Sequence, residues 1–282
     1  MKKIGMIADE AADIPQNIRE KYQIENIMFP VVFSAEEQET DLRGEAFYRK
    51  MREGQIFPTT SFPPPIRFKR AYQQSLESFE EVLVVVISST LSGAFNTAVS
   101  AKSLLPEADR KRIHVFDSFA ASGAQGLISL RAQELIEEGG DIPAILEDLN
   151  CFKTKVKLLG MGEDVKWLKA GGRISANQAR ILQLLKKIGI NPILGLKEGK
   201  VASAGFFFLK DEVKVLLGCI KKTVEKTSGL KTVISYSDNI SKALELKEGI
   251  EEMGAEVLYV TVSSPVIGAH IGPGTIIVSY CS

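Results

Sequence analysis

The chain has 282 residues, of which 45% are hydrophobic and 25% charged, and its formal net charge is zero. This composition predicts one large globular domain or two modest ones, with a substantial core. It argues against nucleic acid as the main partner, because binding to a phosphate backbone needs a net basic face.

The N-terminal apolar run, residues 4–8, ends at Asp9 and is shorter than the roughly 7–15 apolar residues of a secretory signal. No other run reaches the roughly 20 apolar residues of a membrane-spanning helix. The three cysteines are widely spaced and form no C-x-x-C motif: Cys151, Cys219 and Cys281. Together these features predict a cytoplasmic protein with reduced thiols and no stable membrane insertion.

The first half alternates between strand and helix patterns. Short apolar runs predict buried strands at 4–8, 82–87 and 113–116. Apolar residues spaced by three or four predict helices at 66–79, 128–136 and 142–149. Asp141 would cap the last of these. This alternation predicts an N-terminal α/β domain, residues 1–155, with a mostly parallel sheet and helices on both faces.

The second half combines a hairpin pattern with further strand–helix alternation. Runs 191–196 and 201–208 flank Lys197-Glu198-Gly199-Lys200, as expected for a β-hairpin. Other apolar runs predict strands at 231–236, 256–262 and 276–280, with helices at 211–226 and 240–253. The expected C-terminal α/β domain, residues 156–282, therefore has a mixed sheet.

Hydroxyl-rich loops follow two predicted strands. Ser88-Ser89-Thr90-Leu91-Ser92-Gly93 follows one strand and opens a helix, while Asp117-Ser118 and Ser122-Gly123 follow another. Sites in open α/β sheets form at the carboxyl ends of strands, where helix amides and hydroxyls favour an anion. Helix capping is the alternative, and it is favoured for Asp117 and Ser122. Thr59-Thr60-Ser61 could likewise face a pocket or cap the helix that starts at Pro64 or Pro65.

Arg173 and His270 are the other candidates for an anion site. Arg173 follows Gly171-Gly172, and its planar guanidinium suits a carboxylate or phosphate, although a solvated arginine would also fit this position. His270 lies in segment 264–274, whose prolines and glycines (Gly268, Gly272 and Gly274) predict a rigid loop. His114, within a strand pattern, is predicted to be structural.

Several common kinds of site lack their motifs. Neither G-x-G-x-x-G nor G-x-x-x-x-G-K-[ST] is present, which removes the usual support for nucleotide binding. No histidine or cysteine cluster supports a metal site. Ser92 and His270 could form a hydrolase pair, but no G-x-S-x-G motif supports it.

Taken in order, these motifs resemble the DegV family of bacterial lipid-binding proteins over essentially the whole chain. The matching pieces are Thr60-Ser61 before the prolines, residues 88–93, Leu168-x-x-Gly-Gly-Arg173-Ile174, residues 264–274 and, as a fifth, Asp117-Ser118 with Ser122-Gly123 and Gln125-Gly126. Three positions depart from the family pattern: Ala8-Asp9-Glu10 replaces Thr-Asp-Ser, Phe62 replaces Gln, and Ile271 replaces Thr. Ile271 lacks a hydroxyl that could contact the ligand head group.

The resemblance implies two α/β domains with a long-chain fatty acid buried between them. It implies a protein without catalysis, metal or cofactor that presents the fatty acid's carboxylate to a separate ATP-dependent fatty acid kinase. By position, the carboxylate would be held by Thr60, Ser61, Ser92, Arg173 and His270. The supporting loop residues would be Ser89, Gly93, Gly172, Gly272 and Gly274.

Two other functions remain open from the sequence. One is a Ser/His hydrolase acting on a small ester through Ser92 and His270. The other is a carrier of a different anionic lipid or metabolite that works without a kinase. The sequence does not define the chain length or unsaturation of the lipid, the kinase or the oligomeric state.

Overall fold

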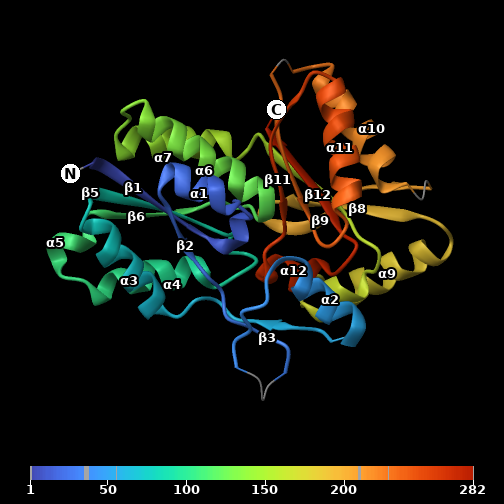
Figure 1. Ribbon diagram of the computed structural model, residues 1–282, viewed down its shortest axis with the longest axis horizontal. Coiled ribbons are helices and arrows are strands. Elements are labelled where there is room, and N and C mark those ends of the chain that lie inside the picture. Colours follow the sequence, from blue (N-terminus) through green and yellow to red (C-terminus); the bar gives the residue numbers. More distant parts are fainter. Residues whose placement is uncertain (1, 35–37, 55, 209–210, 228, 282) are drawn as a thin grey trace.

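The computed structural model describes residues 2–34, 38–54, 56–208, 211–227 and 229–281. Its first sheet has four parallel strands in the order β2-β1-β5-β6 (Figure 1). Their bounds are Lys2–Asp9 for β1, Ile24–Ile27 for β2, Phe79–Val86 for β5 and Ile113–Asp117 for β6. This is the parallel sheet that the apolar runs predict.

Helices cover both faces of this sheet, with α3 and α4 on one side and α6 and α7 on the other (Figure 1). The helices of this half are α1 (Gln16–Tyr22), α2 (Gly44–Gly54), α3 (Pro65–Leu76), α4 (Ala94–Ala101), α5 (Glu107–Arg110), α6 (Ser122–Glu137) and α7 (Ile142–Phe152). Two 3₁₀ turns, η1 (Glu10–Ala12) and η2 (Lys102–Leu104), and a small antiparallel pair, β3 (Val31–Val32) with β4 (Thr59–Thr60), complete it.

The second sheet has six strands in the order β11-β10-β12-β7-β8-β9. Only β10 and β11 are parallel neighbours, so the sheet is mixed, as predicted. The strands are β7 (Val156–Met161), β8 (Asn191–Lys197), β9 (Lys200–Phe207), β10 (Lys231–Tyr236), β11 (Glu256–Val262) and β12 (Ile276–Cys281). The helices are α8 (Lys166–Ala170), α9 (Ala176–Lys187), α10 (Glu212–Val224), α11 (Ile240–Glu252) and α12 (Pro265–Ile271).

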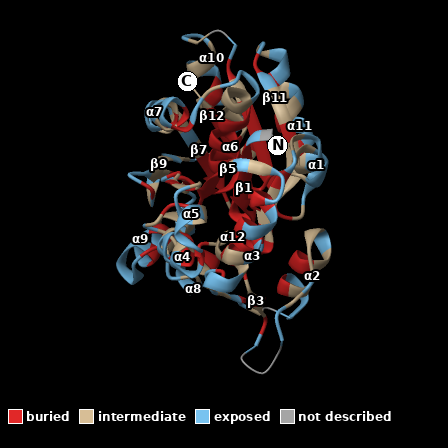
Figure 2. Ribbon diagram, turned by 90° about the vertical axis from the view of Figure 1, so that its left-hand side faces the viewer, coloured by how far each residue is buried: buried red, intermediate tan, exposed pale blue. Residues whose placement is uncertain are grey.

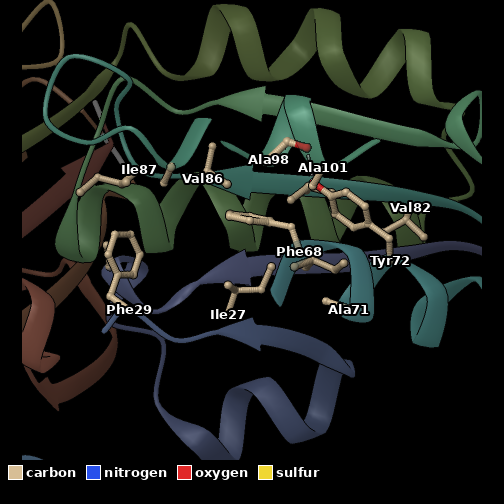
Figure 3. Close-up of a cluster of buried hydrophobic side chains, with 14 of the residues drawn as sticks. Ile27, Phe29, Phe68, Ala71, Tyr72, Val82, Val86, Ile87, Ala98 and Ala101 are labelled. Atoms are coloured by element: carbon tan, nitrogen blue, oxygen red, sulfur yellow. Dashed lines mark hydrogen bonds between the residues drawn. The ribbon is translucent and has the colours of Figure 1, made fainter. Parts of the chain in front are cut away.

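Alternating side chains of the first sheet fill two cores. Val82, Val84 and Val86 pack against α3 and α4, whereas Leu83 and Val85 pack towards α6 and α7. Figure 3 shows the first core, in which Phe68 and Tyr72 of α3 lie between the strands and α4. The Tyr72 hydroxyl donates to the carbonyl of Ala98 at 2.9 Å, which satisfies its buried polar atom.

Helix α6 lies at the centre of the molecule and contacts strands of both sheets, β1 and β5 as well as β7, β10 and β12. Most of its residues up to Gln133 are buried, and the buried region in Figure 2 surrounds it. A helix in contact with protein on all sides cannot show a one-sided apolar pattern. The two sheets therefore share this helix, and the division into domains at residues 155–156 stays a prediction.

Two predicted elements differ from the structure. The helix expected at 66–79 ends at Leu76, and Phe79 begins β5 instead, where its ring packs over Gly5 of β1. The segment 264–274, expected to be a rigid loop, contains helix α12. Gly272 and Gly274 have positive φ there, but Gly268 lies inside the helix, where its missing side chain makes room for the Tyr48 hydroxyl.

Three acidic residues at the end of β1 and directly after it are buried: Asp9, Glu10 and Asp13. Burial raises the pKa of Asp9 to about 7, that of Glu10 to about 7 and that of Asp13 to about 6. Asp9 accepts hydrogen bonds from the Ile87 amide at 2.9 Å and the Gln125 side chain at 2.8 Å. These contacts only partly replace the water that the carboxylate loses.

We expect Asp9 to make the stability fall as the pH rises. Its pKa moves from 3.8 to about 7 on folding, so the folded protein keeps a proton that the unfolded chain releases between these values. At about 1.4 kcal/mol per pKa unit, this linkage is of the order of 4 kcal/mol over the whole window. Urea unfolding at pH 5 and pH 8 should show wild type losing stability relative to Asp9→Asn. A difference between the two proteins that does not change with pH would contradict this linkage.

Candidate functional site

A cavity of about 600 Å³ lies between the two sheets. This volume is within the range of small-molecule sites. Much of its wall is apolar and comes from both halves of the chain: Phe29, Ile87, Ala121, Leu158, Leu194, Leu196, Val201 and Ile277. Phe29 and Ile87, labelled in Figure 3, belong both to this wall and to the core beneath it.

The five predicted contact residues, spread over more than 200 positions of sequence, all line this one cavity: Thr60, Ser61, Ser92, Arg173 and His270. Among the supporting residues, Ser89 and Gly93 also line it. Gly172, Gly272 and Gly274 do not; Gly272 abuts the Trp167 ring and Gly274 abuts the Glu163 carboxyl group. The fold thus gathers the polar candidates at a cavity whose wall is largely apolar.

His270 lies in the last turn of α12, with its Nε2 atom 3.0 Å from the Thr60 hydroxyl. The backbone of Gly171 approaches the other side of the ring so closely that a Cβ at residue 171 would overlap Nδ1. Burial, and secondarily the positive charge of Arg173, lowers the pKa of His270 to about 3. The imidazole is therefore neutral at physiological pH, and one of its nitrogens carries a hydrogen-bond donor.

Arg173 lies opposite Gly171 in the turn between α8 and α9. Its Nη1 donates to the Gly171 carbonyl at 2.6 Å, and its Nε donates to the Leu91 carbonyl at 3.3 Å. Gly172 has a φ of +70°, which turns the chain before the Ser175–Gln178 capping box of α9. Burial lowers the pKa of Arg173, but a guanidinium stays charged in proteins.

No carboxylate in the described part of the chain forms an ion pair with Arg173. The carboxylate that lines the same cavity, Asp164, pairs with Lys166 at 3.5 Å instead. A half-buried guanidinium without a counter-charge favours an anionic ligand, because burial strengthens the attraction between opposite charges. The cavity therefore offers a fixed positive charge beside a neutral imidazole and several hydroxyls.

The loop at residues 88–93 is held in place by short-range hydrogen bonds. The Ser92 hydroxyl accepts from the Ala94 amide at 3.2 Å, and the Ser89 amide donates to Asp117 at 3.2 Å. Thr90, which also lines the cavity, donates from its hydroxyl to the Gly199 carbonyl at 2.7 Å. Sequence reasoning gave Thr90 no role of its own, because its partner lies more than 100 residues away.

The capping interpretation of Asp117 and Ser122 is wrong. Asp117 accepts from the Ser89 and Phe119 amides, and α6 begins after Ala121 without a side-chain cap. Ser122 has a φ of +52° and donates its hydroxyl to Asp13, so it is not available to cap the helix. Pro65 does start α3, as predicted, and Thr60 pairs with Val31 in a short strand rather than capping that helix.

Two of the departures from the family pattern lie at the cavity. Phe62 packs against Gly93, where a Cβ would lie 2.7 Å from its ring. Ile271 also lines the cavity, and its carbonyl accepts from the Thr275 hydroxyl at 2.9 Å. Phe62 is half exposed at 53%, so it lies at the rim of the cavity rather than at its floor.

The described ranges contain no group of three or more His, Cys, Asp or Glu residues that could hold a metal ion. Within the same ranges, no helix is both long and apolar enough to cross a bilayer.

The family model described as an uncharacterised protein of the DegV family matches residues 3–282. This chain belongs to the DegV family. Protein DegV of Bacillus subtilis is 29% identical, with 99% of each chain covered. A Thermotoga maritima protein named fatty acid-binding protein is 32% identical over 97% of this chain and 96% of its own length.

Solved structures of DegV-family proteins have the same fold. A Thermus thermophilus member, described by its fatty acid binding, superimposes with a TM-score of 0.87 at 30% identity, covering 99% of both chains. DegV of Bacillus subtilis, described as a fatty acid binding protein, gives a TM-score of 0.85 at 28% identity over 100% of this chain and 99% of its own. The α/β architecture and the resemblance to the family are thus confirmed.

Proposed function

We propose that this DegV-family protein binds a long-chain fatty acid in the cavity between its sheets. The observation that carries the proposal is a largely apolar cavity of about 600 Å³ whose wall holds Arg173, an arginine without a carboxylate partner among the described residues. The names of its relatives support the same ligand class. The carboxylate would contact Thr60, Ser61, Ser92, Arg173 and His270.

The apolar wall accounts for most of the affinity in this proposal. A C16 acid buries about 14 methylenes at roughly 0.8 kcal/mol each, which sets an upper limit of about 11 kcal/mol. The polar end mainly avoids the cost of burying an unpaired carboxylate. Arg173 supplies the charge, and the Thr60 and Ser92 hydroxyls can supply further donors.

The neutral state of His270 fits this role. A neutral imidazole can accept from Thr60 at Nε2 or donate through Nε2 to Thr60, depending on which ring nitrogen carries the proton. In the described structure Nδ1 is buried and has no hydrogen-bond partner. Because Nδ1 is buried against the backbone of Gly171, we assign the Nε2–H tautomer to the bound state: Nε2 donates to the Thr60 oxygen, and the Thr60 hydroxyl can donate to the carboxylate.

The bound acid would then be presented to a separate ATP-dependent fatty acid kinase in the cytoplasm, with no catalysis by this chain. The hydroxyls and Arg173 hold the carboxylate in one place, so that the γ-phosphoryl group of ATP could be transferred to a carboxylate oxygen. The test is acyl-phosphate formation, trapped with hydroxylamine, when loaded protein is mixed with ATP and the candidate kinase. Product that forms equally well without this protein would contradict the presentation role.

The geometry gives less support to the hydrolase alternative. Among the described residues, Ser92 makes no hydrogen bond to His270, and no carboxylate orients Nδ1. A nucleophilic serine needs both a base and a group that orients the base. Ester turnover that disappears in Ser92→Ala, without kinase or ATP, would favour the hydrolase. Uptake of a different anionic lipid or metabolite in preference to fatty acids would favour the carrier.

A further inference from the structure

Asp13 joins three parts of the chain that are distant in sequence. Its Oδ2 accepts from the Ser122 hydroxyl at 2.6 Å, and its Oδ1 accepts from the Ser264 amide at 2.8 Å. Asp13 is only 4% exposed and Ser122 only 1%, so solvent hardly competes for these hydrogen bonds. One carboxylate thus links the end of β1 and η1 to the starts of α6 and α12.

Both contacts lead directly to the cavity. Ser122 lines it from the first half of the chain. Ser264 is the N-cap residue of α12, but its side chain makes no capping hydrogen bond. Asp13 supplies an acceptor and a negative charge there, which the helix dipole favours. The same seven-residue helix carries His270 in its last turn.

The backbone around this link is constrained. Asp13 has a φ of +50° and Ser122 a φ of +52°, a region that residues other than glycine rarely adopt. Such conformations persist where the surrounding structure fixes them, and they cluster at binding sites. Here each strained residue is hydrogen-bonded to the other through its side chain.

We propose that Asp13 is a positioning residue of the fatty-acid site, which holds α12 and Ser122 so that His270 meets Thr60 beside the ligand carboxylate. This inference rests on the proposed function. Asp13 does not line the cavity, so its effect on binding passes through Ser122 and, by way of α12, through His270. A second contact retains α12, since the Tyr48 hydroxyl donates to the Ser263 carbonyl at 2.9 Å. Loss of Asp13 should therefore shift the helix rather than unfold it.

Two substitutions separate the hydrogen bonds of Asp13 from its charge. In Asp13→Asn, the amide oxygen can accept from the Ser264 amide while the NH₂ donates to the Ser122 oxygen, because a hydroxyl can also accept. In Asp13→Ala both links are lost. We expect palmitate binding by titration calorimetry to weaken at least 10-fold in Asp13→Ala and to stay within about 3-fold of wild type in Asp13→Asn.

The chain contains only two histidines, so the imidazole NMR resonances can show directly whether the hydrogen bonds of Asp13 position His270. NMR of the imidazole groups should show the His270 resonances shifted in Asp13→Ala and restored in Asp13→Asn. His114, bonded to Glu81 at 2.8 Å on the first sheet, is an internal reference and should not change. General loss of structure would move both histidines.

Wild-type palmitate affinity together with wild-type His270 resonances in Asp13→Ala would overturn the proposal. Should Asp13→Ala fail to fold, Asp13→Glu replaces it, since its extra methylene moves the carboxylate away from both donors. His270 resonances that stay in their wild-type positions in that variant would be equally decisive. If wild type binds no fatty acid, the proposed function fails, but the His270 resonances still test the link.

Discussion

Replacing Arg173 with alanine should weaken palmitate binding by about 10- to 100-fold. Hydrogen bonds to charged groups contribute about 1.5–3 kcal/mol, and 1.4 kcal/mol corresponds to a factor of ten. Arg173 has no carboxylate partner in the described part of the chain, and its contacts with Leu91 and Gly171 use only two of its five N–H donors. The remaining donors are available to the ligand. Calorimetric titration with palmitate measures the loss.

Two controls show whether this loss belongs to the head group. Hexadecanol has the same tail but no charge, so Arg173→Ala should affect its binding much less than that of palmitate. Arg180→Ala removes an exposed arginine from α9 and should bind palmitate like wild type. Equal losses for palmitate and hexadecanol in Arg173→Ala would mean that Arg173 supports the fold of the cavity and does not contact the carboxylate.

Gly171→Ala should disrupt the site through sterics alone. The added Cβ would overlap Nδ1 of His270, so the ring must leave its position beside Thr60. We expect palmitate affinity to fall by a factor of ten or more and the His270 NMR resonances to shift. The change adds one methyl group and removes no polar atom. It therefore tests the position of the imidazole while every hydrogen-bonding group of the site is kept.

Gly172→Ala is the matched control for this prediction. Gly172 has a φ of +70°, so alanine there costs about 1–2 kcal/mol of stability. However, a Cβ at this position meets nothing within 4 Å and cannot push on His270. Gly172→Ala should therefore melt at a lower temperature but keep its palmitate affinity. If both glycine variants bind palmitate equally well, His270 does not contribute to the site in the way proposed.

The sequence predicts the sheets well because their strands are buried. Residues 82–87 are all β-branched except Leu83, which favours a strand covered on both faces, and the structure places β5 at Phe79–Val86. The hairpin pattern around Glu198-Gly199 is equally direct, since these two residues have positive φ between β8 and β9. Local sequence patterns are enough to predict a strand or a turn when the residues that determine its conformation are close together in the sequence.

Prediction fails where tertiary contacts decide. Helix α12 contains Pro265 and Gly268, which favour a loop locally, but five of its residues are buried in the core, and Pro at a first helical position is well tolerated. The helical spacing of Phe79 extends the predicted helix to residue 79, but α3 ends at Leu76 and the Phe79 ring packs over Gly5 instead.

The candidate contact residues came from the resemblance and the loops, and the structure shows which other residues of those loops line the cavity. Thr90 and Ser122 are two such residues, and each is held by a hydrogen-bond partner more than 100 residues away. The sequence does contain a signal for Asp13, which is the last of three acidic residues directly after the predicted buried strand at 4–8. Such a segment is not expected to be exposed, so its acidic side chains need partners within the protein. Its partners at residues 122 and 264 could not be predicted without the fold.

The central claim is that the cavity holds a long-chain fatty acid. The most direct test is mass spectrometry of the organic extract from freshly purified protein, with quantification against the protein. The account predicts a long-chain fatty acid at close to one equivalent in wild type and substantially less in Arg173→Ala. An extract without fatty acid, together with no uptake of added palmitate, would contradict it and would shift support to a small anionic metabolite or an ester substrate.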